Sequence, residues 1–199
     1  MSSEGVNKNR RRFLTGTVSV VGAIGAVGVA IPFVKMWQPS ARARAAGAPV
    51  EVTIDKLEPG QMLKAEWRGR PVWILRRTDE MLATLDLVED QLRDPNSEAQ
   101  DQQPDFAENQ YRSLNPEYLV LLGICTHLGC SPKFVPEVEP QPFDPDWKGG
   151  FFCPCHNSRF DLAGRVYQGV PAPLNLEVPP YSFLDDNRLL IGIGPEGAA

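Results

Sequence analysis

The sequence predicts a mainly β protein in which one N-terminal transmembrane helix precedes an antiparallel β domain. Three observations predict this fold class. A long apolar run follows a basic N-terminus, as is typical of a membrane helix. The remaining chain alternates short β-branched and aromatic runs with turn residues, and the 19 Pro and 17 Gly disfavour a helical bundle. The 199 residues suffice for one ordinary domain and an anchor.

The charge of the chain is unevenly distributed. Residues 1–44 hold seven Lys or Arg and one Glu, a net charge of +6, so residues 45–199 carry −11 of the total of −5. An acidic body disfavours nucleic acid, whose phosphates require a basic surface. It suits a cationic protein partner better.

The N-terminus predicts export and membrane anchoring. Asn9-Arg10-Arg11-Arg12-Phe13-Leu14 resembles a twin-arginine export signal, so residues 1–13 are predicted to be cytoplasmic. The alternative is an ordinary signal-anchor, whose basic residues only set orientation. The 23 residues from Leu14 to Met36 would span ~34 Å, enough for a bilayer core of ~30 Å. We expect residues 14–37 to stay as a single-pass anchor, because the run exceeds the ~7–15 apolar residues of a cleaved signal.

A short linker separates this anchor from the exported domain. Residues 38–49 are rich in Ala, Arg, Gly and Pro and are predicted to form a flexible tether. Residues 50–199 form the predicted β domain, with Gly69 in the turn between its second and third strands. The polar stretch 85–110 is predicted to be a small, partly helical surface insertion. The predicted strands are 50–54, 62–67, 71–77, 118–124, 150–152, 165–167, 176–179, 181–185 and 188–193.

The strongest signal is a cluster of potential metal ligands. All four Cys and both His lie within the 32 residues from Cys125 to His156. They occupy two strings, Cys125-Thr126-His127-Leu128-Gly129-Cys130 and Cys153-Pro154-Cys155-His156-Asn157-Ser158. Two Cys and two His suit either structural zinc or a mixed-ligand iron–sulfur cluster. Two structural disulfides with idle histidines are a third interpretation.

Residues 125–130 and 153–158 resemble both cluster-binding loops of the Rieske iron–sulfur proteins, in the branch found in quinol-oxidising cytochrome bc complexes. The resemblance implies a Rieske domain over residues 50–199, with a cluster-binding lobe at about 122–175. It implies one [2Fe-2S] cluster held by Cys125, His127, Cys153 and His156, a disulfide between Cys130 and Cys155, and a hydrogen bond from Ser158 to a cluster sulfur. Residues 169–173 resemble the proline loop of that family.

The resemblance also implies a function. The chain would take an electron from ubiquinol, and a proton through His156, and pass the electron to a c-type cytochrome. Its partners would be cytochrome b and a membrane-anchored c-type cytochrome. The complex would be dimeric and proton-translocating and would lie in the bacterial inner membrane, with the head in the periplasm. The alternatives are the Rieske subunit of a periplasmic molybdenum oxidase, such as arsenite oxidase, and a zinc-stabilised module without enzymatic activity.

Two positions depart from the pattern of the family. Phe160 stands where many relatives have a Tyr that donates a hydrogen bond to a cysteine ligand. Asn157 stands where Gly is common, and we expect it to adopt the left-handed backbone conformation, which Asn tolerates best after Gly.

Overall fold

The computed structural model describes residues 5, 7–41, 43 and 47–195. The chain divides into two compact units, Met1–Ala45 and Ala46–Ala199. The predicted tether at 38–49 falls partly outside the described residues.

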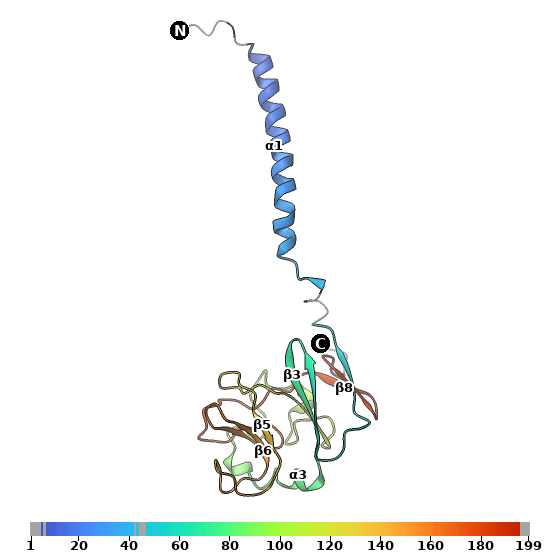
Figure 1. The fold of residues 1–199 in the computed structure, drawn as a ribbon, viewed down its shortest axis with the longest axis vertical. Coiled ribbons are helices and arrows are strands. Elements are labelled where there is room, and N and C mark those ends of the chain that lie inside the picture. The colour runs from blue at the N-terminus through green and yellow to red at the C-terminus, as the bar shows by residue number, and fades with distance from the viewer. Residues whose placement is uncertain (1–4, 6, 42, 44–46, 196–199) are drawn as a thin grey trace. The chain divides into compact units, whose positions relative to one another are not determined.

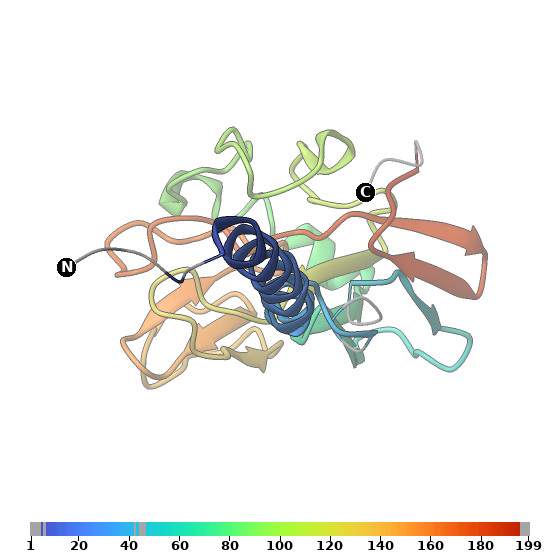
Figure 2. The ribbon, with the colours of Figure 1, turned by 90° about the horizontal axis from the view of Figure 1, so that it is seen from above.

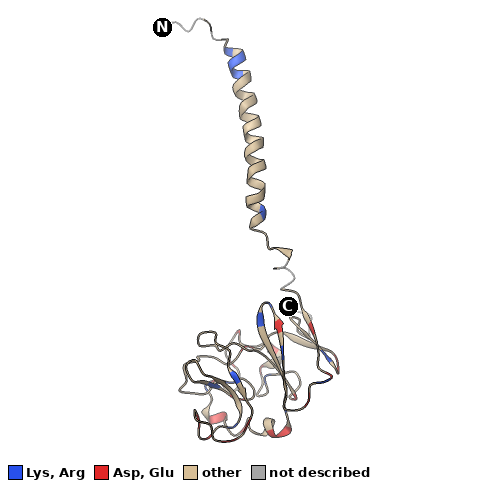
Figure 3. Cartoon of the chain, in the orientation of Figure 1, with Lys and Arg blue, Asp and Glu red and all other residues tan. Residues whose placement is uncertain are grey.

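The first unit contains one long helix, α1, over Lys8–Met36 (Figure 1). The Asn7 side chain caps it by accepting hydrogen bonds from the Asn9 and Arg10 amides, at 3.1 Å each. No residue of α1 is buried, and the helix is long and apolar enough to cross a membrane. Figure 3 shows its basic residues gathered at the N-terminal end, with Lys35 near the other end.

The middle sheet of the second unit has the order β2-β3-β4 and is antiparallel. Arg68 and Gly69 join β2 to β3 with φ values of 53° and 71°, as a two-residue turn with two left-handed residues requires. All five residues of β4 are buried, as are the four central residues of β3. These two strands therefore form the centre of the core. The bounds are Met62–Trp67 for β2, Arg70–Arg76 for β3 and Tyr118–Leu122 for β4.

Two further antiparallel sheets lie at opposite ends of the unit (Figures 1 and 2). One has the order β1-β9-β8 and the other β5-β6-β7. Their strands are β1 (Val50–Thr53), β8 (Tyr181–Asp185), β9 (Arg188–Ile191), β5 (Lys133–Val135), β6 (Gly150–Cys153) and β7 (Ser158–Phe160).

Aromatic side chains join the middle sheet to its two neighbours. Trp73 on β3 stacks on Phe151 of β6, with ring centroids 5.3 Å apart and an interplanar angle of 18°. Tyr118 on β4 meets Phe183 of β8 edge to face at 5.8 Å. The strand that leads to Cys153 is therefore packed directly on the centre of the core.

The segment between β3 and β4 is only partly the surface insertion that the sequence predicts. Its helical turns are short: α3 (Asp79–Ala83) precedes the predicted stretch, and the 3-10 turns η1 (Glu89–Gln91) and η2 (Asp105–Ala107) lie within it. Many of its polar side chains are exposed, but Leu85, Val88 and Leu92 are buried. The segment thus contributes to the core, and Leu92 pairs with Tyr167 through an isolated bridge.

Three arginines are buried in the irregular part of this unit. Arg77 donates to the carbonyls of Pro116 and Leu162, and Arg112 to that of Leu176. Burial lowers the pKa of both guanidinium groups to about 10. Arg165 pairs with Asp161 at 2.7 Å, and both side chains are 2% exposed. Guanidinium groups therefore satisfy carbonyls that have no strand partner.

Most of the predicted strands are confirmed, and two are wrong. Residues 165–167 make only isolated bridges, and residues 176–179 form no strand. The Leu176 carbonyl accepts from Arg112, and the amides of Leu176 and Val178 donate to the carbonyls of Gly164 and Gln102. The short strands β5 and β7 were not predicted, because three residues are too few for an alternating pattern to appear.

Gly123 lies between β4 and the first string of potential ligands, so a substitution there tests how closely the core is packed beside that string. A Cβ atom at this position would lie 2.2 Å from the Trp73 ring. We expect Gly123→Ala to lower the free energy of unfolding by at least about 2 kcal/mol, measured by chemical denaturation with circular dichroism.

Trp73→Phe is the control, because it replaces the indole, which the added Cβ atom would overlap, by a smaller ring. The double variant should be less destabilised than the sum of the two single variants. Simple additivity would contradict the proposed steric cause.

Candidate metal centre

The first string, Cys125–Cys130, forms a closed loop directly after β4. The Cys125 amide donates to the Cys130 carbonyl at 2.7 Å, and the Gly129 amide donates to the Cys125 carbonyl at 3.0 Å. Gly129 has a φ of 82°, which favours glycine. The loop therefore returns on itself and presents its side chains from one short segment.

The second string forms the hairpin loop between β6 and β7. Cys153 and Ser158 are paired across the hairpin, and residues 154–157 make the turn. Asn157 has a φ of 60°, which confirms the expected left-handed conformation. Both strings thus project from the ends of buried strands.

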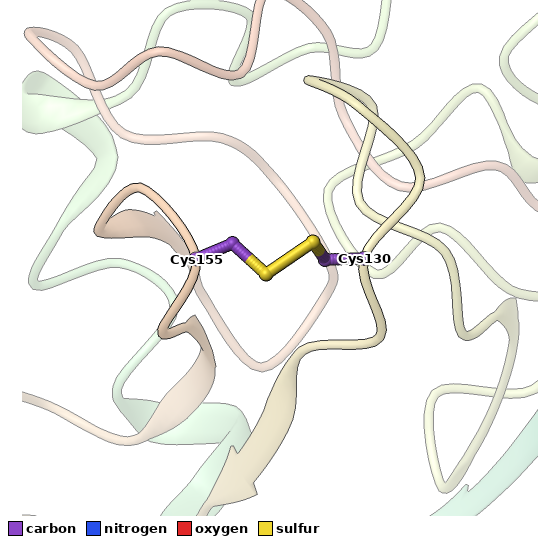
Figure 4. Close-up of a disulfide and its surroundings, with 2 residues drawn as sticks. All are labelled: Cys130 and Cys155. Atoms are coloured by element: carbon purple, nitrogen blue, oxygen red, sulfur yellow. A yellow bond between two sulfur atoms is a disulfide. The ribbon is translucent and has the colours of Figure 1, made fainter.

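A disulfide between Cys130 and Cys155 joins the two loops (Figure 4). This confirms the pairing that the family resemblance implied. The bond closes a segment with a sequence separation of 25 residues, for which chain entropy predicts a stabilisation of roughly 3 kcal/mol. The covalent link keeps the two loops facing each other.

The other two cysteines and the two histidines are divided equally between these loops. Cys125 and Cys153 are free, buried thiols. The rings of His127 and His156 are 4.6 Å apart between centroids, with an interplanar angle of 87°. His156 is exposed and His127 is half-buried. The structure therefore places one buried thiol and one imidazole on each loop, with the two imidazole rings side by side.

The surroundings of Cys125 act in opposite directions on its pKa, and the net effect is a raised pKa. Burial raises the pKa of the Cys125 thiol, and the neighbouring Cys153 thiol raises it further. The His127 backbone N–H and the Ser158 hydroxyl act in the opposite direction on this pKa, because they donate hydrogen bonds to the sulfur. Donors placed around a buried sulfur are typical of a thiolate that binds a metal.

The donor set fits a mixed thiolate and imidazole cofactor. His127 Nδ1 is buried and has no hydrogen-bond partner in the part of the chain that the structure describes, so its lone pair is available to a metal. The sulfurs of Cys130, Cys153 and Cys155 also lie within 4.8 Å of one another. Two of these sulfurs form the disulfide and offer no thiolate, so we favour the set of two thiols and two imidazoles.

A third segment, residues 169–173, packs against the two loops. The Ala172 amide donates to Ser158 Oγ at 3.0 Å. Thr126 Oγ1 donates to the Leu174 carbonyl at 2.6 Å, which joins the first loop to the end of this segment. The Thr126 contact was not predicted from the sequence, although its place between two candidate ligands could have drawn attention to it.

Exposed apolar side chains belong to the two loops and to the end of the third segment. Leu128 is 70% exposed and Leu174 is 37% exposed. Pro154 is also exposed. This apolar rim, defined by Leu128, Pro154 and Leu174, gives the site a surface that can exclude water on contact with a partner.

Comparisons with known proteins agree with this geometry. Residues 1–40 match the family described as "Ubiquitinol-cytochrome C reductase Fe-S subunit TAT signal", and residues 95–180 match the Rieske [2Fe-2S] domain. The "Ubiquinol-cytochrome c reductase iron-sulfur subunit" of Allochromatium vinosum is 58% identical over 192 residues, which cover 96% of this chain and 92% of the relative. The chain belongs to the Rieske iron–sulfur subunit family of ubiquinol–cytochrome c reductase.

Other members of the Rieske iron–sulfur subunit family match over nearly the whole chain. The subunit of the same name from Blastochloris viridis is 40% identical, over 97% of this chain and 98% of the relative. That from Bradyrhizobium diazoefficiens is 38% identical, over 96% of this chain and 98% of the relative. The expected mainly β Rieske domain, the twin-arginine signal and the [2Fe-2S] Rieske cluster are confirmed by these matches and the fold.

Proposed function

We propose that this chain is the electron-accepting subunit of a quinol-oxidising respiratory complex, and that it is active only within that complex. The observation that supports the proposal is one buried thiol and one imidazole on each of two loops that a disulfide joins, with exposed apolar side chains on the same loops. A chain with these groups and no other cofactor motif needs partners to complete a turnover.

Cys125 and Cys153 would hold one iron as thiolates, and His127 and His156 would hold the other through imidazole nitrogens. For His127 the buried, unpartnered Nδ1 is the ligand atom that the geometry favours. When bound, the cluster supplies one-electron chemistry at ~−150 to +300 mV, a range in which a quinol can be the donor.

His156 is the residue that we propose contacts the quinol. Its ring is exposed, whereas that of His127 is half-buried. The ring nitrogen that does not bind iron can accept a hydrogen bond from a quinol hydroxyl and then hold its proton. Leu128, Pro154 and Leu174 would exclude water around this contact.

The N-terminal unit would place the head at the membrane. Residues 1–13 would stay in the cytoplasm, residues 14–37 would cross the bacterial inner membrane once, and the Rieske domain of residues 50–199 would lie in the periplasm. The cluster-binding lobe would occupy about 122–175. A flexible tether over 38–49 would let the head reach cytochrome b and then a membrane-anchored c-type cytochrome, in a complex that we propose is dimeric.

The purified complex tests the proposal. After detergent extraction of the full chain, we expect haem-containing subunits, together with non-haem iron and acid-labile sulfide in equal amounts and ubiquinol-dependent cytochrome c reduction. Co-purification with molybdenum would instead support a periplasmic molybdenum oxidase. Zinc without iron or sulfide would support the non-enzymatic module.

Cysteine variants test the assignment of ligands. Cys125→Ser and Cys153→Ser should each lose iron and the paramagnetic signal of the reduced cluster, because each removes one of two thiolates. The double variant Cys130→Ala/Cys155→Ala is the matched control. It should retain iron when prepared in the cold, with a free energy of unfolding lower by roughly 3 kcal/mol. Iron retained by Cys153→Ser and lost by the double variant would contradict the ligand set.

Phe160 allows a test of how the chain sets the potential. It lies on β7 two residues after Ser158 and is fully buried, so both side chains point to the same face of the strand. Phe160→Tyr should raise the midpoint potential in a redox titration, because a hydroxyl donor near the ligand sulfurs favours the more negative, reduced state.

Phe152→Tyr is the control for this substitution, because Phe152 stacks on Phe143 and is paired with Arg159, on the other face of the hairpin. It should leave the midpoint potential unchanged. No change or a fall in Phe160→Tyr, or an equal rise in both variants, would refute a specific hydrogen bond from position 160.

A further inference from the structure

Three sulfur atoms lie close together where the two loops meet. The Sγ atoms of Cys130, Cys153 and Cys155 are all within 4.8 Å of one another. Cys130 and Cys155 form the disulfide, and Cys153 is a free thiol. A thiol beside a disulfide can exchange with it, because its thiolate attacks one sulfur and expels the other. The disulfide therefore has a nucleophile within reach in its own loops.

Burial limits the other reactions that are open to Cys153. This residue is only 2% exposed, so a dissolved disulfide or oxidant has little access to its sulfur. The neighbouring disulfide is already in place, and a reaction within one folded chain avoids the entropy cost of bringing two molecules together. Exchange within the chain is therefore the reaction that the geometry favours for this thiol.

The exposure of the leaving sulfur favours attack on Cys130. Cys155 is exposed and Cys130 is half-buried, so a thiolate expelled from Cys155 is hydrated and costs less than one expelled from Cys130. Attack on Cys155 would join residues 153 and 155 across Pro154 alone, and the proline ring restricts φ at that position. A link from Cys153 to Cys130 joins two separate loops, as the present disulfide does.

The product of this attack would keep the two loops joined. Cys153 and Cys130 are 23 residues apart in the sequence, and Cys155 and Cys130 are 25 residues apart. Because the entropy of loop closure depends only weakly on length, the two links restrict the unfolded chain almost equally. Chain entropy therefore does not oppose the exchange, whereas a bond that occupies the Cys153 sulfur would oppose it.

We propose that, in the chain without its metal centre, the Cys153 sulfur attacks Cys130 Sγ and converts the 130–155 disulfide into a 130–153 disulfide. The new sulfur–sulfur bond forms as the bond between Cys130 and Cys155 breaks, and the electron pair leaves on Cys155. The proton of the Cys153 thiol passes through water to Cys155. One disulfide and two thiols are present before and after the step, so no external oxidant or reductant takes part.

The exchange would remove one of the proposed ligands. Cys153 would become part of the disulfide, and the free thiols would be Cys125 and Cys155. While Cys153 binds a metal centre, its sulfur cannot act as the nucleophile, so ligation also protects the disulfide pairing. This consequence rests on the proposed function of Cys153 as a ligand, whereas the exchange itself rests only on the three neighbouring sulfurs.

Two matched variants of the full chain test the exchange. Cys125→Ser keeps Cys153 and the disulfide, whereas Cys153→Ser keeps Cys125 and the disulfide, and both are prepared without iron. Each is purified in mild acid, which suspends thiol exchange, and is then incubated at about pH 8.5, near the pKa of an ordinary thiol. Circular dichroism verifies that both variants keep their strands.

The position of the free thiol is followed by sequential labelling. Samples are labelled with N-ethylmaleimide in acidic denaturant, reduced, and then labelled with iodoacetamide. Fragmentation of the peptides in a mass spectrometer assigns a label to each cysteine. A maleimide label on Cys155 reports the proposed exchange, and a maleimide label on Cys153 reports the original pairing.

In Cys125→Ser we expect the maleimide label to move from Cys153 to Cys155, at least about ten times faster than any disulfide cysteine becomes labelled in Cys153→Ser. The reason is that the close group of sulfurs includes Cys153 and not Cys125. The rate should not depend on protein concentration. A label that stays on Cys153, moves to Cys130 instead, moves equally fast in both variants, or moves at a rate proportional to protein concentration would overturn the proposal.

The unaltered chain provides a second measurement. After a chelator removes the metal centre without oxygen, the label should move from Cys153 to Cys155, and the iron taken up on later reconstitution should fall as this label rises. The chain that retains its metal centre should keep the 130–155 pairing, and equal exchange with and without the centre would contradict the proposal. If the label moves but the unaltered chain never binds iron, the exchange stands and the proposed function fails.

Discussion

The central constraint on this protein is the burial of sulfur atoms that must carry negative charge. Removing a thiolate from water is costly, and desolvation alone would keep Cys125 protonated. The His127 N–H and the Ser158 hydroxyl lower this cost in part, although the pKa of Cys125 stays raised. The disulfide and the loop of residues 169–173 hold the segments that carry these groups. Both loops and the proline-containing segment are arranged around these buried sulfur atoms.

A second requirement follows from the composition of the domain. A chain with many prolines and short strands leaves carbonyl groups that no neighbouring strand can satisfy. Arg77, Arg112 and Arg165 supply donors at these places, each reaching carbonyls far away in the sequence. The irregular segments behind the metal centre are therefore held by buried guanidinium groups, at the cost of desolvating three charges near a single buried aspartate, Asp161.

Local patterns explain which features were predictable. The ligand strings, the anchor and the hairpin at Gly69 each depend on residues close together in the chain, and each was found. The burial of Leu85, Val88 and Leu92 was missed because the surrounding residues are polar, and Tyr167, the bridge partner of Leu92, lies 75 positions away. The contact between Ala172 and Ser158 involves a backbone amide, which every residue except proline has, so the residue type does not predict this donor. Hydrogen bonds of this kind depend on the folded arrangement of segments, which a single sequence does not encode in any local pattern.

The stack of Trp73 on Phe151 has a consequence for the separation of the two thiols. One ring lies on the strand beside β4, which leads to Cys125, and the other lies on the strand that ends at Cys153. Flat, rigid aromatic rings hold a nearly constant spacing, and Gly123 leaves no room for the indole to shift toward the first loop. The stacked rings in the core thus help to set the distance between the two strands that lead to the thiols. A change of ring size there would therefore change the space between the thiols that a metal centre could occupy.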